Sequence, residues 1–118
     1  MDSSWTDEED IAIAVSYAAA HDEGTHSVSD PAFWGQVLNL FCIHVQQTTR
    51  SPNDLDTRCA FLRFKCSRFL GRYKNVKKKD RNNMAEKEVI EEALLDYAII
   101  YDEDFEHISV FEILKNYI

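Results

Sequence analysis

The sequence predicts an all-α fold, and three observations support this. The chain of 118 residues contains 3 Gly and 2 Pro, too few for the many tight turns of an all-β fold. Apolar residues recur three and four positions apart along most of the chain, as they do on the buried face of a helix. Residues that cap helix N-termini precede several of these segments. The length fits one domain spanning residues 1–118.

The first helix is expected to begin after Thr6 and to stop near His21. Thr6 can accept a hydrogen bond from a free amide of the first turn, and Glu9 can return one as a capping box. The apolar positions that recur at helical spacing are Ile11, Ala14, Val15 and Ala18.

The second helix is expected to start with Asp30 as the N-cap and Pro31 at the first helical position. It should end between Val45 and Thr48. Its predicted buried stripe consists of Phe33, Trp34, Val37, Leu38 and Phe41. We expect both tryptophans of the chain, Trp5 and Trp34, to lie in the core, because large aromatic rings wedge short helices together.

The third helix is expected over residues 54–76. With Arg58 set at zero and about 100° per residue, one set of apolar residues falls between about 20° and 100°. This predicted core stripe consists of Leu55, Cys59, Leu62, Cys66, Phe69 and Tyr73.

A basic stripe lies beside the core stripe, between about 280° and 360° on the same helix. It consists of Arg58, Lys65, Arg68 and Arg72. Phe61 lies within it, and either stacking on a base or packing against another helix would suit this ring. Phe64 lies near its edge and is expected to pack. The non-functional interpretation is that arginine stems lie along apolar surface and that cations suit a helix C-terminus.

Charge is segregated along the chain, although the net charge is −8. The segment 58–81 contains ten Lys or Arg and one Asp, whereas 1–30 carries eight acids and no Lys or Arg. A basic block of this density is typical of a surface that binds phosphate. The average charge therefore does not exclude a nucleic-acid partner.

Two further helices are expected in a C-terminal extension, 85–118, after a basic linker at 77–84. The fourth spans about 85–101 and the last about 107–116. The fourth helix has a predicted acidic face of Glu88, Glu91, Glu92 and Asp96. We interpret it mainly as solvated surface, with a contact to a basic surface as the alternative.

Several classes of protein are disfavoured. The chain has no apolar run of about 18 residues, which predicts no membrane span, and its start lacks the pattern of a signal peptide. Its 3 Cys include no C-x-x-C pair, so neither a disulfide framework nor a zinc site is predicted. No catalytic motif is present. We expect no enzyme activity, cofactor, metal or small-molecule substrate.

The order of five motifs resembles that of Myb/SANT-like proteins related to plant trihelix factors and to the DNA-binding partner of Harbinger-type transposases. The opening W-T-D-E-E-D at 5–10 is similar to W-T-x-E-E-D, and residues 24–37 resemble G-T-x-x-x-x-D-x-F-W-x-x-V. Residues 50–58 are similar to R-T-x-x-x-L-x-x-R, residues 68–73 to K-F-x-G-x-Y, and residues 105–115 to F-x-F-x-x-x-W-x-x-L. Cys59 and Phe111 stand where the family pattern has Trp, which bears on packing more than on charge.

The resemblance implies a three-helix helix-turn-helix core over 1–76, with one or two additional C-terminal helices. It implies a nuclear protein that binds double-stranded DNA with its third helix in the major groove, in transcription or as a transposon-derived DNA-binding protein. The predicted DNA-binding residues are Arg58, Phe61, Lys65, Arg68, Arg72, Lys74, Lys77, Lys78, Lys79 and Arg81. A protein partner or a homodimer would raise the affinity of a single domain. The alternative function is a SANT-type protein-interaction module whose acidic faces bind a basic partner such as a histone tail.

Overall fold

The computed structural model describes residues 4–46 and 48–118, and within these ranges it contains helices and no strands. The helices are α1 (Asp7–Glu23), α2 (Pro31–His44), α3 (Pro52–Lys79), α4 (Glu86–Tyr101) and α5 (Ile108–Leu114). The predicted all-α class is therefore confirmed.

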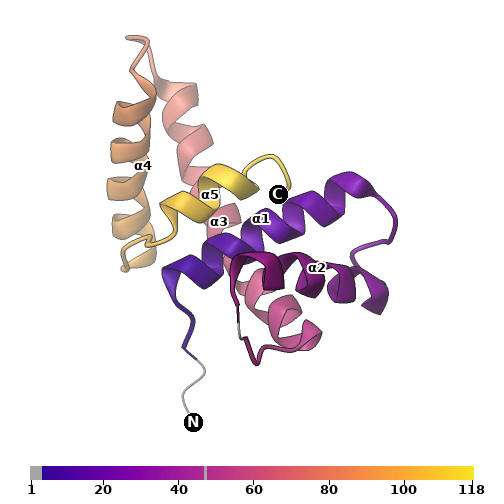
Figure 1. Ribbon diagram of the computed structural model, residues 1–118. Coiled ribbons are helices and arrows are strands. Elements are labelled where there is room, and N and C mark those ends of the chain that lie inside the picture. The colour runs from indigo at the N-terminus through magenta and orange to yellow at the C-terminus, as the bar shows by residue number, and fades with distance from the viewer. Residues whose placement is uncertain (1–3, 47) are drawn as a thin grey trace.

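The long helix α3 connects the two ends of the molecule (Figure 1). Its first half packs against α1 and α2, and its second half runs antiparallel to α4. The α3–α4 turn projects beyond the other helices, whereas α5 crosses α3 and also packs against α1. At about 1.5 Å per residue, 28 residues span about 42 Å, which approaches the longest dimension of the molecule, 46 Å.

The N-terminal caps form as the sequence predicts. The hydroxyl of Thr6 accepts a hydrogen bond from the amide of Glu9 at 3.1 Å, and the Glu9 carboxylate accepts one from the amide of Thr6. Asp30 caps α2 through the amide of Ala32 at 2.9 Å. These bonds satisfy amides that have no partner within the helix.

Several predicted helix ends are wrong, including that of the last helix, which spans Ile108–Leu114 and so ends two residues before the predicted 116. α1 continues to Glu23 and ends at Gly24, whose φ of +71° suits a residue without Cβ. α2 ends at His44, one residue before the predicted range. α3 starts at Pro52 and continues through Lys79, so the first three residues of the predicted linker 77–84 are helical. Lysines are good helix formers and suit the negative end of the helix dipole.

A single core extends through all five helices. The predicted core stripe of α3 is buried except Tyr73, which is half-buried. Trp34 is buried, and its indole N–H donates to the carbonyl of Val28 at 3.0 Å. Trp5 is only half-buried and packs against this core, so the expectation that both tryptophans are core residues holds fully for Trp34 alone.

Aromatic rings attach the C-terminal extension to α3. Phe69 stacks on Phe105 with ring centroids 4.4 Å apart, and Phe111 meets Phe69 edge-on at 4.8 Å. Such pairs add about 0.5–1.5 kcal/mol each beyond the burial of their area. Helices α4 and α5 and the segment between them therefore contribute to the same core as α1–α3.

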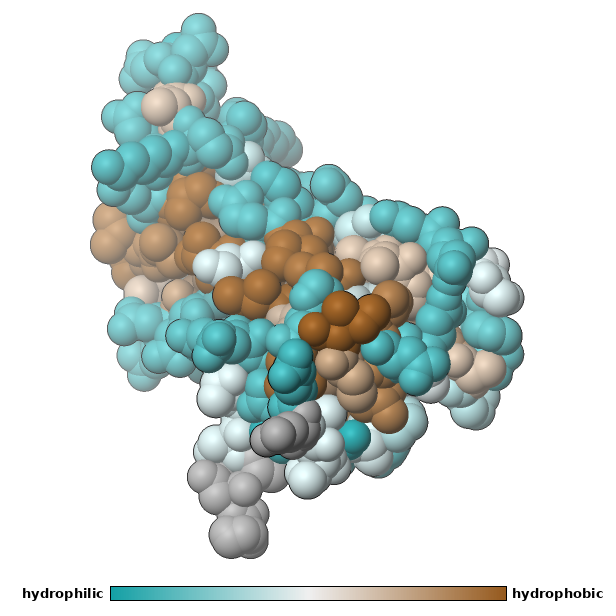
Figure 2. All heavy atoms as spheres, viewed as in Figure 1, coloured by the Kyte–Doolittle hydropathy of each residue, from teal (hydrophilic) through white to brown (hydrophobic). Residues whose placement is uncertain are grey.

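The visible surface combines charged regions with apolar ones. Apolar side chains gather over the half of α4 away from the α3–α4 turn and over the region of α5 (Figure 2). Among the residues that the structure describes, the helices are all too short or too polar to cross a membrane.

Candidate nucleic-acid interface

The helix α3 positions every cation of the predicted interface except Arg81. It begins at a capping box in which the Ser51 hydroxyl accepts from the amide of Asp54 at 3.1 Å and the Asp54 carboxylate accepts from the amide of Ser51 at 2.8 Å. These hydrogen bonds lower the pKa of Asp54. Pro52 occupies the first helical position. No other proline occurs in α3, and the helix continues to Lys79.

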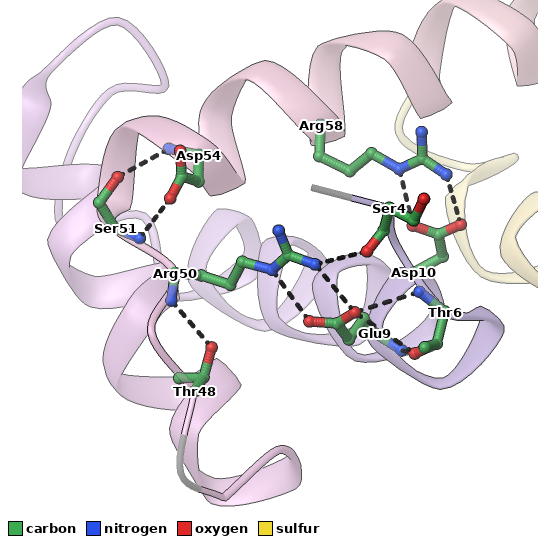
Figure 3. Close-up of polar contacts among 9 residues, drawn as sticks. All are labelled: Ser4, Thr6, Glu9, Asp10, Thr48, Arg50, Ser51, Asp54 and Arg58. Carbon is green, nitrogen blue, oxygen red and sulfur yellow. Dashed lines mark hydrogen bonds and ion pairs between the residues drawn. The ribbon is translucent and has the colours of Figure 1, made fainter. Parts of the chain in front are cut away.

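Arg58, the first cation of the predicted basic stripe, binds the carboxylate of Asp10 in α1 (Figure 3). Its Nε and Nη2 atoms donate to the two carboxylate oxygens, each at 2.8 Å. Asp10 is 2% exposed. A two-pronged pair with a buried carboxylate holds the guanidinium in place, so Arg58 joins α3 to α1.

Arg50 forms a second connection to α1, at the opening of α3 (Figure 3). Its Nε atom donates to Glu9 at 3.0 Å, and Nη2 donates to the carbonyl of Ser4 at 2.8 Å. Its guanidinium lies 3.7 Å above the Trp5 ring. The hydrogen bonds from Arg50 lower the pKa of Glu9, against the opposing effect of burial. The sequence analysis did not predict this ion pair. The only signals for these two residues were the W-T-D-E-E-D motif at 5–10, which contains Glu9, and the motif that begins with Arg50.

Lys65, the second cation of the stripe, pairs with Glu103 in the α4–α5 connection. The same carboxylate accepts a hydrogen bond from the hydroxyl of Tyr97 at 2.9 Å. The ammonium of Lys65 and this hydroxyl lower the pKa of Glu103. Burial and the neighbouring carboxylate raise the pKa of Tyr97 to about 12.

The two remaining stripe cations contact α4. The guanidinium of Arg68 lies 3.7 Å above the ring of Tyr101, an arrangement in which the cation is attracted by the negative face of the ring. Arg72 donates to Asp96 at 3.3 Å. All four stripe cations are half-buried. The acidic face of α4 is therefore not wholly solvated, since Asp96 pairs within the chain.

The two phenylalanines beside the stripe differ from each other. Phe61 is 40% exposed and lies under the guanidinium of Arg58 at 4.7 Å and near the Lys65 ammonium at 5.6 Å. Phe64 is 56% exposed. The prediction that Phe64 packs is wrong, because more than half of this side chain is exposed; the guanidinium of Arg68 lies 5.2 Å from its ring.

The other predicted cations remain at the surface, at the projecting end of α3 and in the following turn. They are Lys74, Lys77, Lys78, Lys79 and Arg81, all of which are exposed. Within residues 4–46 and 48–118, none of these five forms an ion pair. The turn is held by Asp80, whose carboxylate accepts from the amides of Asn82 at 2.9 Å and Met84 at 2.8 Å.

A separate face of α3 is exposed from Ala60 to Lys78. Its members fall between about 160° and 240° when Arg58 is set at zero, and we call it the exposed α3 face. It consists of Ala60, Phe64, Ser67, Gly71, Lys74 and Lys78. Space around Gly71 is open, with no atom within 4 Å of the position that a Cβ would take.

No metal-binding group was found in the described part of the chain: its His, Cys, Asp and Glu side chains do not gather in threes. Cys59 and Cys66 are buried, and burial raises the pKa of each thiol to about 12. Such thiols stay protonated and are poor metal ligands and nucleophiles.

The structure thus divides the predicted interface in two. Arg58, Lys65, Arg68 and Arg72 contact the protein itself, whereas the cations at the end of α3 face solvent. In comparisons with protein-family models, curated proteins and solved structures, no match to the chain was found.

Proposed function

We propose that the chain is a DNA-binding module that contacts double-stranded DNA through the exposed α3 face and the cations around the α3–α4 turn. The observation that carries this proposal is a group of five exposed cations at the projecting end of a long helix and in the turn after it, which form no ion pair with any described residue. Free cations on a projecting helix can neutralise phosphates without first losing an internal partner.

The exposed α3 face suits the approach of a duplex. Ser67 and Gly71 are small, so the helix backbone can come close to a groove. Lys74 and Lys78 follow one turn apart on the same face, where they can reach phosphates. Phe64 offers an aromatic surface to a thymine methyl group. The proposed contact is therefore turned by about 120° around α3 from the predicted basic stripe.

The resemblance to Myb/SANT-like proteins supports the same function. In that arrangement, α1, α2 and the first half of α3 would form the helix-turn-helix core, and α4 and α5 would be its C-terminal extension. By the same resemblance, the protein would act in the nucleus, in transcription or as a transposon-derived DNA-binding protein. The alternative, a SANT-type module that binds a histone tail, has fewer acids available than expected, because Glu9 and Asp10 of α1 pair with arginines.

The test is titration of a fluorescent random duplex at about 50 mM and about 200 mM salt. Lys74→Glu with Lys78→Glu should weaken binding at least about tenfold, because two attractive contacts become repulsive. Lys115→Glu, far along the chain from α3, is the matched control and should change affinity by less than about twofold. Absence of binding by the unaltered chain at low salt would reject the DNA proposal and leave the protein-interaction alternative.

A further inference from the structure

α4 exposes three large aliphatic side chains, Leu95, Ile99 and Ile100, and the first two lie one helical turn apart. Leu95 and Ile99 are 64% and 79% exposed. α4 buries the opposite side, where Val89, Ala93 and Tyr97 belong to the protein interior. Exposed single aliphatic residues are common, but two large ones a helical turn apart form a ridge.

The ridge belongs to a longer seam with alternating spacings of four and three residues. We call it the α4 seam: Glu88, Glu92, Leu95 and Ile99 lie on α4, and Asp102 directly follows the helix as its C-cap, with a left-handed φ of +54°. This spacing is the one by which two helices pack along each other. The seam is acidic at both ends and apolar in the middle, and all its members are exposed. Figure 2 shows apolar side chains over the half of α4 away from the α3–α4 turn, the half that contains residues 95–101.

A groove runs beside the seam, between the end of α3 and α4. Val76, Met84, Leu95 and Ile99 are the apolar residues of its lining, and Lys79 and Asp80 line it near the α3–α4 turn. Both Val76 and Met84 are half-buried, so apolar surface continues from the ridge into the groove. A flexible methionine adapts readily to the side chains of a partner.

We propose that the α4 seam binds an amphipathic helix of another polypeptide, with an apolar centre and Lys or Arg at both ends of the contact. The charge of the seam favours this partner. Cations at one end of the partner helix would meet Glu88 and Glu92, and cations at its other end would meet Asp102. Apolar residues between them would cover Leu95 and Ile99 and enter the groove.

A second copy of the chain is a poor occupant of this seam. In a parallel α4 pair each acid would face its own copy, and in an antiparallel pair Glu88 would face Asp102. Like charges placed across an interface oppose association. The seam shares no residue with the exposed α3 face or with the five exposed cations, although Lys79 lines the neighbouring groove. This proposal therefore goes beyond DNA binding and does not depend on it.

The test uses two synthetic helical peptides of about 18 residues with the same Leu and Ile seam, one with Lys at the flanking seam positions and one with Glu. Fluorescence anisotropy should show binding of the Lys peptide to the full chain, and binding of the Glu peptide at least about tenfold weaker. Leu95→Ser with Ile99→Ser should weaken binding of the Lys peptide at least about tenfold. These variants keep the charge of the seam and alter only exposed positions.

The matched control is Ile43→Ser in α2, which changes an aliphatic residue that is 71% exposed elsewhere on the surface. It should leave peptide affinity within about twofold. Equal binding of the Lys peptide by the Ser double variant would overturn the proposal, because attraction would then be due to charge alone. A dimer that sedimentation detects in the unaltered chain and not in the double variant would also overturn it, in favour of a second copy. Duplex binding measured on the same variants should be unchanged.

Discussion

Arg58 and Asp10 form a two-pronged ion pair that joins α3 to the first turn of α1, with both hydrogen bonds at 2.8 Å. A residue expected to read DNA thus has a buried carboxylate as its partner. The pair explains why a cation of the predicted stripe can lie beside the core without being available to a ligand. It also gives Asp10, one of the eight acids in segment 1–30, a structural role.

Asp10→Ala should destabilise the fold by about 3 kcal/mol, since removal of one partner of a buried ion pair leaves the other charge uncompensated. Urea denaturation followed by circular dichroism measures this change. Asp7→Ala, which alters an exposed acid of the same turn, should change the free energy of unfolding by less than about 0.5 kcal/mol. Equal effects of the two substitutions would contradict the assigned role of Asp10.

The pair Arg72–Asp96 should tolerate exchange of its charges. Arg72→Glu alone brings two carboxylates together and should destabilise the fold by about 1 kcal/mol. The double variant Arg72→Glu with Asp96→Arg should recover most of that loss. Its duplex affinity should stay within about twofold of the unaltered chain, because Arg72 is assigned to an ion pair with Asp96 of the same chain. A large loss of affinity in the stable double variant would restore the predicted stripe as the contact surface.

The salt dependence of duplex binding should report the number of free cations in contact with phosphate. If all five exposed cations of α3 and the turn contact DNA, log K should fall with log salt with a slope of about −4.5. Lys74→Gln with Lys78→Gln should reduce the slope to about −2.7. The same slope for both proteins would show that these lysines do not contact phosphate.

Acid should weaken the connection between α1 and the start of α3. Arg50 lowers the pKa of Glu9 from its ordinary value of 4.5, so the unfolded chain takes up the proton at a higher pH than the folded one. This contribution to stability is present above pH 4.5 and is lost as pH falls through the pKa of the folded state. Glu9→Gln should therefore lower the Tm at pH 7, and the difference from the unaltered chain should shrink at pH 3. Glu8→Gln, at an exposed position, should lower the Tm at neither pH.

One of the three cysteines should react in the folded protein. Cys42 is exposed, whereas Cys59 and Cys66 are buried and burial raises the pKa of each to about 12. Titration with a thiol-reactive disulfide reagent should modify one thiol quickly, and all three only in denaturant. Cys42→Ser should abolish the fast phase. Rapid reaction of a second thiol would show that the α3 core stripe opens readily.

Local sequence patterns determined the helices and much of the core. Capping residues such as Thr6, Asp30 and Ser51 act on amides three residues away or fewer, and a buried stripe repeats with each helical turn. Both signals are contained in short segments, so they can be read without knowledge of the fold. The end of α3 differed from the prediction because Lys77, Lys78 and Lys79 are good helix formers and do not stop the helix.

The partners of the basic stripe depended on tertiary structure. A helical projection places Arg58, Lys65, Arg68 and Arg72 on one arc, but it says nothing of what faces that arc. Only the packing of α1 and α4 on α3 brings Asp10 and Asp96 to two of these cations, across 48 and 24 residues of chain. The sequence by itself therefore determined that α3 is a basic, amphipathic helix. The three-dimensional fold decided which cations are neutralised by carboxylates of the same chain and which remain free at the surface, because charge pairing depends on distances of a few ångström between segments far apart in sequence.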